Sequence, residues 1–72
     1  MTRTKKELKQ IAQRALELRY GFAPALNRIE LLETYSDGTY MLFRVGVVEY
    51  RFDSHYKSDG TLWVDEYCVS RI

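Results

Sequence analysis

The stretch that decides the fold is residues 40–52, which read YMLFRVGVVEYRF. Apolar and polar residues alternate on both sides of Gly46-Val47, a pattern typical of strands with one buried face. Glycine at the first central position suits a two-residue type II′ turn, and such a turn fixes which residues face each other. The stretch therefore predicts a hairpin in which three apolar pairs share one side of the sheet: Val45 with Val48, Phe43 with Tyr50, and Met41 with Phe52.

Similar turn sequences stand before and after this hairpin. Residues 36–39 and residues 58–61 both read SDGT, and Asp-Gly accepts the positive φ angles that a type I′ turn requires. We expect the same turn chemistry to be used twice, because four matching residues are too few to establish an internal repeat. Together the three turns predict four antiparallel strands joined as consecutive hairpins.

The first strand is placed at residues 28–34, although a second interpretation stays open for residues 25–33. Pro24 favours the first position of a helix, with Leu26 and Ile29 on one side of it. The hairpin signal that follows favours a strand instead. Taken literally, the turns put Leu32 and Thr34 on the face of the central apolar pairs. In the last hairpin they place Tyr67 opposite Phe52 and Val69 opposite Tyr50.

The N-terminal segment predicts a helix over residues 4–19. Thr4 followed by Glu7 fits a reciprocal capping box, Gly21 suits a left-handed cap, and Pro24 opposes continuation. Apolar residues recur at three- and four-residue spacing, which lines one helix face: Leu8, Ile11, Ala12, Ala15 and Leu16. The fold class is therefore α+β, a single domain over residues 1–72 with an N-terminal helix packed on one face of a four-stranded antiparallel β-meander, in the order α-β-β-β-β. Aromatic residues are expected to close the core or its edge: Tyr20, Phe22 and Trp63.

Size and composition limit the ways in which so small a domain is stabilised. The chain has one cysteine, Cys68, and one histidine, His55, so we expect no internal disulfide, no structural zinc and a cytoplasmic location. No secretory signal or membrane span is recognised, and no cofactor or metal is expected. A domain of this size buries only about 60% of its unfolded surface. Self-association as a homodimer is the remaining source of stability.

A second apolar face is the main functional indication. Beside the pair Arg44 and Glu49, the predicted register gives the uncovered face more apolar residues than a solvated face carries: Ile29, Leu31, Tyr35, Tyr40, Leu42, Leu62 and Val64. The sequence therefore predicts a non-enzymatic interaction module that uses this face to bind a protein, either a second copy or a larger partner. Small accessory proteins of phages and mobile elements, which bind a host protein, are typical of this size.

Candidate catalytic groups are few. His55 and Cys68 are the one possible thiol and base, but the register separates them by about four strand positions, roughly 13 Å. Asp53 and Glu66 are predicted to face each other, which paired acid–base carboxylates require. A surface charge cluster explains that pair as well. Residues 53–59 lack the alternating oxygen ligands of a calcium loop. The sequence thus favours a protein that is not an enzyme.

The helix carries the nucleic-acid alternative. Residues 1–19 hold six basic and two acidic residues, a net charge of +4, whereas residues 20–72 hold five basic and eight acidic residues, a net of −3. Basic side chains on the helix and before it could contact phosphates: Arg3, Lys5, Lys6, Lys9 and Arg14. No helix-turn-helix or paired aromatic RNA-binding motif accompanies them, and a solvated outer helix face is the ordinary explanation.

Overall fold

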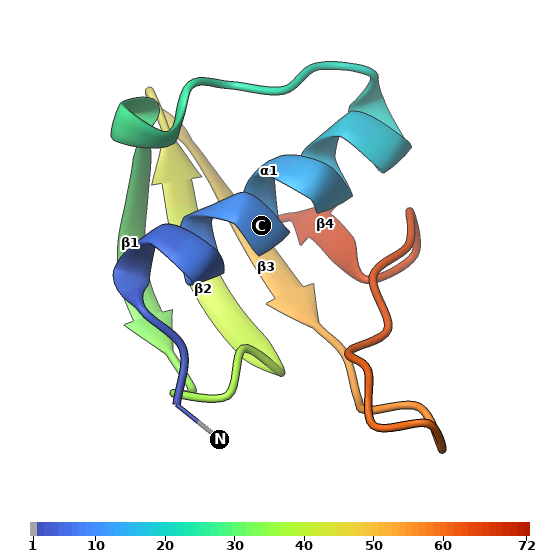
Figure 1. Ribbon diagram of the computed structural model, residues 1–72. Coiled ribbons are helices and arrows are strands. Elements are labelled where there is room, and N and C mark those ends of the chain that lie inside the picture. Colours follow the sequence, from blue (N-terminus) through green and yellow to red (C-terminus); the bar gives the residue numbers. More distant parts are fainter. Residues whose placement is uncertain (1) are drawn as a thin grey trace.

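The structure is a computed structural model that describes residues 2–72, and it confirms the predicted α+β architecture (Figure 1). A single long helix, α1, lies on one face of an antiparallel sheet whose strands follow the order β1-β2-β3-β4. A short 3₁₀ helix, η1, comes between α1 and β1. The bounds are α1 Lys5–Tyr20, η1 Leu26–Arg28, β1 Ile29–Thr34, β2 Tyr40–Val45, β3 Val48–Asp53 and β4 Val69–Arg71.

Both ends of α1 are fixed by the predicted caps. The Thr4 hydroxyl accepts a hydrogen bond from the Glu7 backbone N–H at 3.1 Å, and the Glu7 carboxylate accepts one from the Thr4 N–H at 2.8 Å. Gly21 has φ +77° and donates its N–H to the Glu17 carbonyl. The helix therefore lies within one residue of its predicted bounds at each end. No helix of residues 2–72 has the length and apolarity needed to cross a bilayer.

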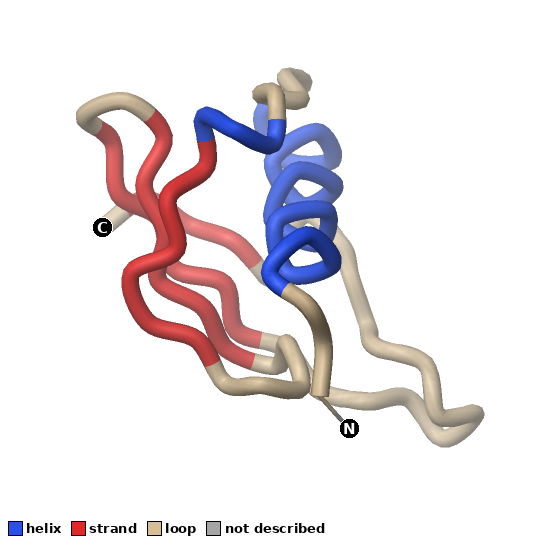
Figure 2. Tube along the Cα trace, turned by 60° about the vertical axis from the view of Figure 1, so that its left-hand side comes forward, coloured by secondary structure: helices blue, strands red, loops and turns tan. Residues whose placement is uncertain are grey.

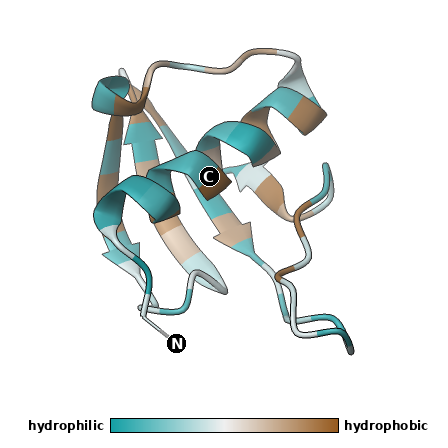
Figure 3. Ribbon diagram, in the orientation of Figure 1, coloured by the Kyte–Doolittle hydropathy of each residue, from teal (hydrophilic) through white to brown (hydrophobic). Residues whose placement is uncertain are grey.

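The core lies between α1 and the sheet. Ala12 and Ala15 are fully buried, and their small side chains let the helix approach the aromatic residues of the sheet closely. Phe43 and Tyr50 stack there with ring centroids 5.4 Å apart. The remaining buried residues come from all parts of the fold: Leu8, Leu16, Ile29, Met41, Phe52 and Val69. Hydrophilic residues cover the outer side of the helix (Figure 3).

The register of β2 with β3 is as predicted, with Val45, Phe43 and Met41 paired to Val48, Tyr50 and Phe52. The register of β1 is correct only as far as Glu33, which pairs with Leu42. A bulge at Leu32 then shifts the pairing, so that Leu31 faces Phe43 and Ile29 faces Val45. Without the bulge, Glu30 would point into the core. The bulge turns Glu30 outward and places Ile29 inside.

The Asp-Gly turns differ from the predicted type. Only the glycines have positive φ, +85° at Gly38 and +87° at Gly60, whereas a type I′ turn needs two such residues. Instead, the carboxylates of Asp37 and Asp59 each accept two hydrogen bonds from the threonine two residues later, one from its N–H and one from its hydroxyl. The prediction that both turns use the same chemistry is therefore confirmed, although the turn type is wrong.

The last hairpin departs most from the prediction. Tyr56 and Leu62 form an isolated bridge, and β4 then pairs Val69 with Phe52 and Arg71 with Tyr50. Residues 63–68 separate Leu62 from β4, whereas only residues 53–55 separate Phe52 from Tyr56. The extra length is taken up by a turn over residues 65–68, closed by the Cys68 N–H on the Asp65 carbonyl. The predicted pairing was therefore wrong by two residues.

Candidate protein-interaction surface

The outer face of the sheet, away from α1, is uncovered among residues 2–72. Figure 2 shows the helix on one side of the strands and no helix or loop across the other. Alternation along the strands places mostly charged residues on this face. Arg44 lies between Glu30 and Glu49, and its guanidinium pairs with Glu30 at 2.8 Å. These charges include the predicted cross-strand pair and form a polar frame.

Four of the seven residues predicted for this face lie elsewhere. Ile29 is buried in the core with 1% of its surface exposed, and Leu31 packs against that core, because the Leu32 bulge reverses this end of β1. Leu62 and Val64 also pack against the core. They belong to residues 54–68, which leave the sheet on the side of the helix (Figure 2). The predicted apolar face was therefore too large.

Three predicted residues remain together, and we name them the outer patch: Tyr35, Tyr40 and Leu42. The rings of Tyr35 and Tyr40 are 5.2 Å apart, and Tyr35 is 63% exposed. Leu42 lies between Glu33 of β1 and Arg51 of β3. The patch is thus an apolar centre with charges around it, the composition that protein interfaces favour.

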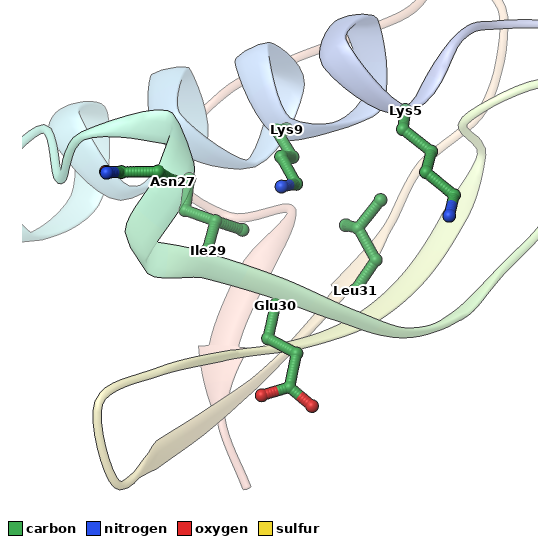
Figure 4. A pocket seen from close by; sticks show the side chains of 6 residues that line it. All are labelled: Lys5, Lys9, Asn27, Ile29, Glu30 and Leu31. Carbon is green, nitrogen blue, oxygen red and sulfur yellow. The ribbon is translucent and has the colours of Figure 1, made fainter.

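A groove on the opposite side of β1 separates this strand from α1. Its volume is about 360 Å³, and Figure 4 shows Lys5 and Lys9 extending from the helix toward the strand. Leu31 points up between helix and strand, whereas Glu30 points away. The groove therefore has an apolar floor and a basic rim, a combination that the sequence did not reveal because Leu31 had been assigned to the other face.

The predicted nucleic-acid contacts divide into two groups. Arg3 is held against the first Asp-Gly turn, where its N–H and its Nε donate to the carbonyls of Ser36 and Asp37, both at 2.8 Å. The position of Arg3 is therefore fixed by contacts within the chain. Arg14 pairs with Glu17 at 3.0 Å on the exposed helix surface. Lys5 and Lys9 line the groove, whereas Lys6 is exposed and is not among the residues that line it.

Neither of the two candidate catalytic pairs is assembled, and His55 and Cys68 are apart as the predicted register required. Asp53 lies opposite Tyr40 and donates its N–H to the Cys68 carbonyl, so Glu66 does not face it. His55 lies against Trp63, with ring centroids 5.5 Å apart, and no hydrogen bond in residues 2–72 joins it to Cys68. The Cys68 thiol instead contacts the Ser54 hydroxyl and an Asp65 carboxylate oxygen, at 3.6 and 3.4 Å.

Asp65 and Asp37 have lowered pKa values because their carboxylates accept hydrogen bonds within turns. The Trp63 indole N–H, and then the Tyr67 N–H, lower the pKa of Asp65. Hydrogen bonds from the Thr39 N–H and hydroxyl lower the pKa of Asp37 in the same way. Both groups are ionised acceptors at neutral pH, the opposite of a general acid. No cluster of three metal-binding side chains occurs in residues 2–72.

The aromatic residues that were predicted to close the core or its edge do so only in part, and Phe22 is 39% exposed. Tyr20 packs on Tyr50, with ring centroids 5.8 Å apart, and closes the core as expected. Trp63 is 42% exposed, and Tyr67, predicted to face Phe52, is 80% exposed. The longer last loop removes both from the core, and the Gly60 turn alone could not have indicated this.

Comparison of the chain with known protein families finds no matching family, and no curated protein or solved structure matches it.

Proposed function

We propose that this protein is a non-enzymatic interaction module of the cytoplasm, and that it self-associates through the outer patch. The observation that carries the proposal is an uncovered sheet face whose centre is apolar. Tyr35, Tyr40 and Leu42 are adjacent there, and no other segment of residues 2–72 covers them. Antiparallel sheets tolerate one solvated face, and apolar clusters on such a face typically mark binding sites.

A second copy is the partner that the size of the domain favours. A chain of 72 residues buries a small core. Cys68 is the single cysteine, and residues 2–72 contain no cluster of three metal-binding side chains, so we propose that association supplies the additional stability. The face is also self-complementary in its central row. Leu42 has an acid, Glu33, on one side and a base, Arg51, on the other. Suppose that two copies pack face to face about a two-fold axis that lies between them, parallel to β2 and above Leu42. Glu33 of each copy would then lie opposite Arg51 of the other copy.

The oligomeric state tests the proposal. The wild-type protein is expected to shift from monomer to dimer with rising concentration in sedimentation equilibrium, and Leu42→Glu is expected to weaken the dimer at least about tenfold by burying a charge. Val47→Glu is the matched control, because Val47 is 96% exposed at the β2–β3 turn, away from the patch. A wild-type protein that stays monomeric at every concentration contradicts self-association. Binding to a larger protein through the same patch would then remain the alternative.

Nucleic-acid binding remains the second candidate. Lys5, Lys6 and Lys9 have no ion-pair partner in residues 2–72, and Figure 3 shows a hydrophilic outer side along α1. The loss of Arg3 and Arg14 to contacts within the chain weakens this candidate. Phosphate contacts need several free cations to give useful affinity.

A further inference from the structure

The groove between α1 and β1 carries positive charge that the chain itself does not neutralise. Lys5 and Lys9 reach toward β1 (Figure 4). The two ion pairs of residues 2–72 join other residues, Arg14 with Glu17 and Arg44 with Glu30. Glu30 also lines the groove, but its side chain points away from the helix (Figure 4) and its carboxylate pairs with Arg44 at 2.8 Å. An anionic group between helix and strand would therefore meet the two lysines on the side away from the Glu30 carboxylate.

The backbone of β1 is open along the same groove, because β1 is an edge strand. Val45 and Val48 flank the two-residue turn and form its bonded pair, so the alternate residues of β2, Leu42 and Arg44, direct their backbone groups to β1. Their partners in β1 are Glu33 and Glu30. Leu31 lies between these two, so its N–H and C=O are directed to the open edge, and Leu31 lines the groove together with Lys5 and Lys9.

The charge distribution of α1 gives an independent indication of an anionic ligand. Lys5 of the groove stands in the first turn of α1, where the partial positive charge of the helix dipole disfavours cations. Helix stability alone therefore does not explain a lysine at this position. Local conflicts of this kind are expected where a sequence serves binding.

We propose that the groove binds an extended acidic segment of another protein, which adds to β1 as a new edge strand. Main-chain bonds at Leu31 would align the segment, and its acidic side chains would meet Lys5 and Lys9. The spacing fits. Alternate residues of a strand are about 6.7 Å apart, and residues one helical turn apart, such as Lys5 and Lys9, are about 6 Å apart along the axis.

A second copy of this chain fits the groove poorly. Pairing of two β1 edges would bring the lysines of both copies toward the same seam, and juxtaposed like charges oppose association. An acidic segment has the complementary charge. This site is also separate from the outer patch, which lies on the opposite face of the sheet, so either proposal can fail without the other.

The probe is a capped seven-residue peptide, Thr-Val-Glu-Val-Glu-Val-Thr, added to the ¹⁵N-labelled full chain. Amide shifts are expected to change along Ile29–Thr34 and near Lys9. Lys9→Glu is expected to weaken the peptide at least about tenfold, because it loses a charge-assisted bond and adds repulsion. Lys6→Glu, the matched control, makes the same charge change outside the groove and is expected to change affinity less than about threefold. A peptide with lysine in place of glutamate is expected not to bind.

Several results would overturn the proposal. Absence of amide shifts in β1, or equal losses from Lys9→Glu and Lys6→Glu, would exclude a specific acidic site. Displacement of the peptide by a short single-stranded oligodeoxynucleotide of higher affinity would assign the lysines to nucleic acid. Aggregation of Lys9→Glu with unchanged peptide affinity would mean that the lysines only guard the edge strand. Lys5→Gln is a second variant with the same expected direction, should Lys9→Glu not fold.

Discussion

Gly38 shows at the scale of one residue how the first Asp-Gly turn is joined to the helix side of the molecule. Its φ is +85°, and an added Cβ would lie 3.0 Å from the Arg3 Cδ and 3.1 Å from the Ile11 Cδ1. The neighbouring Asp37 carbonyl accepts from both the Arg3 Nε and the Tyr56 hydroxyl. The turn is therefore a point where three distant parts of the chain meet.

Gly38→Ala is expected to destabilise the protein by about 2–3 kcal/mol, the sum of left-handed strain and crowding by Arg3 and Ile11. Gly60→Ala is the matched control. Gly60 has nearly the same φ, +87°, but nothing within 4 Å of its added Cβ, so strain alone should cost about 1–2 kcal/mol. Urea unfolding monitored by circular dichroism measures both. Equal losses would mean that Arg3 and Ile11 move aside freely.

The N-terminus of α1 is the element most completely encoded by local sequence. Thr4→Ala removes the hydroxyl that accepts from the Glu7 N–H, and the loss of such a cap is expected to cost about 1 kcal/mol of stability. Thr2→Ala, two residues earlier and exposed, is expected to change stability by less than about 0.5 kcal/mol. The midpoints of urea unfolding give the comparison. A similar loss in both variants would contradict the assigned cap.

The elements that were predicted correctly depend on neighbours in sequence. The capping box, the Gly21 cap and the Gly46-Val47 turn each involve a few adjacent residues, and each appears as predicted. Residues 25–33 contain parts of both proposed structures, a three-residue 3₁₀ helix and then a strand. The helix signal of Pro24 thus corresponds to the first part of the segment, and the hairpin signal corresponds to the strand in the second part.

The wrong predictions depend on long-range choices. The bulge at Leu32 is favoured because it removes Glu30 from the core and places Ile29 there, a gain visible only once the helix covers that face. The sequence did contain one signal for the bulge. In the register without it, Glu30 would pair with Val45 on the core face, where a carboxylate is unfavourable. The additional turn at residues 65–68 had no comparable signal, because Asp65 acts through bonds to Trp63 and Tyr67 that only the fold defines. The outer patch was therefore predicted in part, and the groove was missed.

At the scale of the whole molecule, charge separates across the two layers. Three of the four lysines, Lys5, Lys6 and Lys9, lie on α1, and the outer face of the sheet holds more acidic than basic residues. Glu30, Glu33, Glu49 and Asp53 stand there against Arg44 and Arg51. Such a molecule presents opposite signs to its surroundings on its two sides. The two proposed surfaces therefore select partners of different charge, an acidic segment for the groove and a mixed-charge face for the outer patch.

Four carboxylates spread over the molecule also set how its stability depends on pH. Hydrogen bonds lower the pKa of Glu7 below its ordinary value of 4.5 and those of Asp37, Asp59 and Asp65 below 3.8. A group whose folded pKa is lowered contributes stability that is fully present above its unfolded pKa. That contribution is lost as the pH falls through the folded pKa. These groups hold the helix N-terminus and three separate turns, so acid loosens all of them together.

We therefore expect the free energy of unfolding to be nearly constant from about pH 7 to about pH 5 and to fall steadily from about pH 4.5 to pH 2. Urea unfolding at intervals of about half a pH unit measures this profile. Asp37→Asn keeps an acceptor oxygen but has no proton to take up, so its profile should fall less steeply than that of the wild type in acid. Asp53→Asn is the matched control, because Asp53 is exposed and its carboxylate accepts no hydrogen bond from any group of residues 2–72. The pH profile of this variant should follow that of the wild type. A stability that rose between pH 4.5 and pH 3 would require carboxylates that bind protons more tightly in the folded state, the opposite of what the bonds from Thr4, Thr39, Thr61 and Trp63 impose.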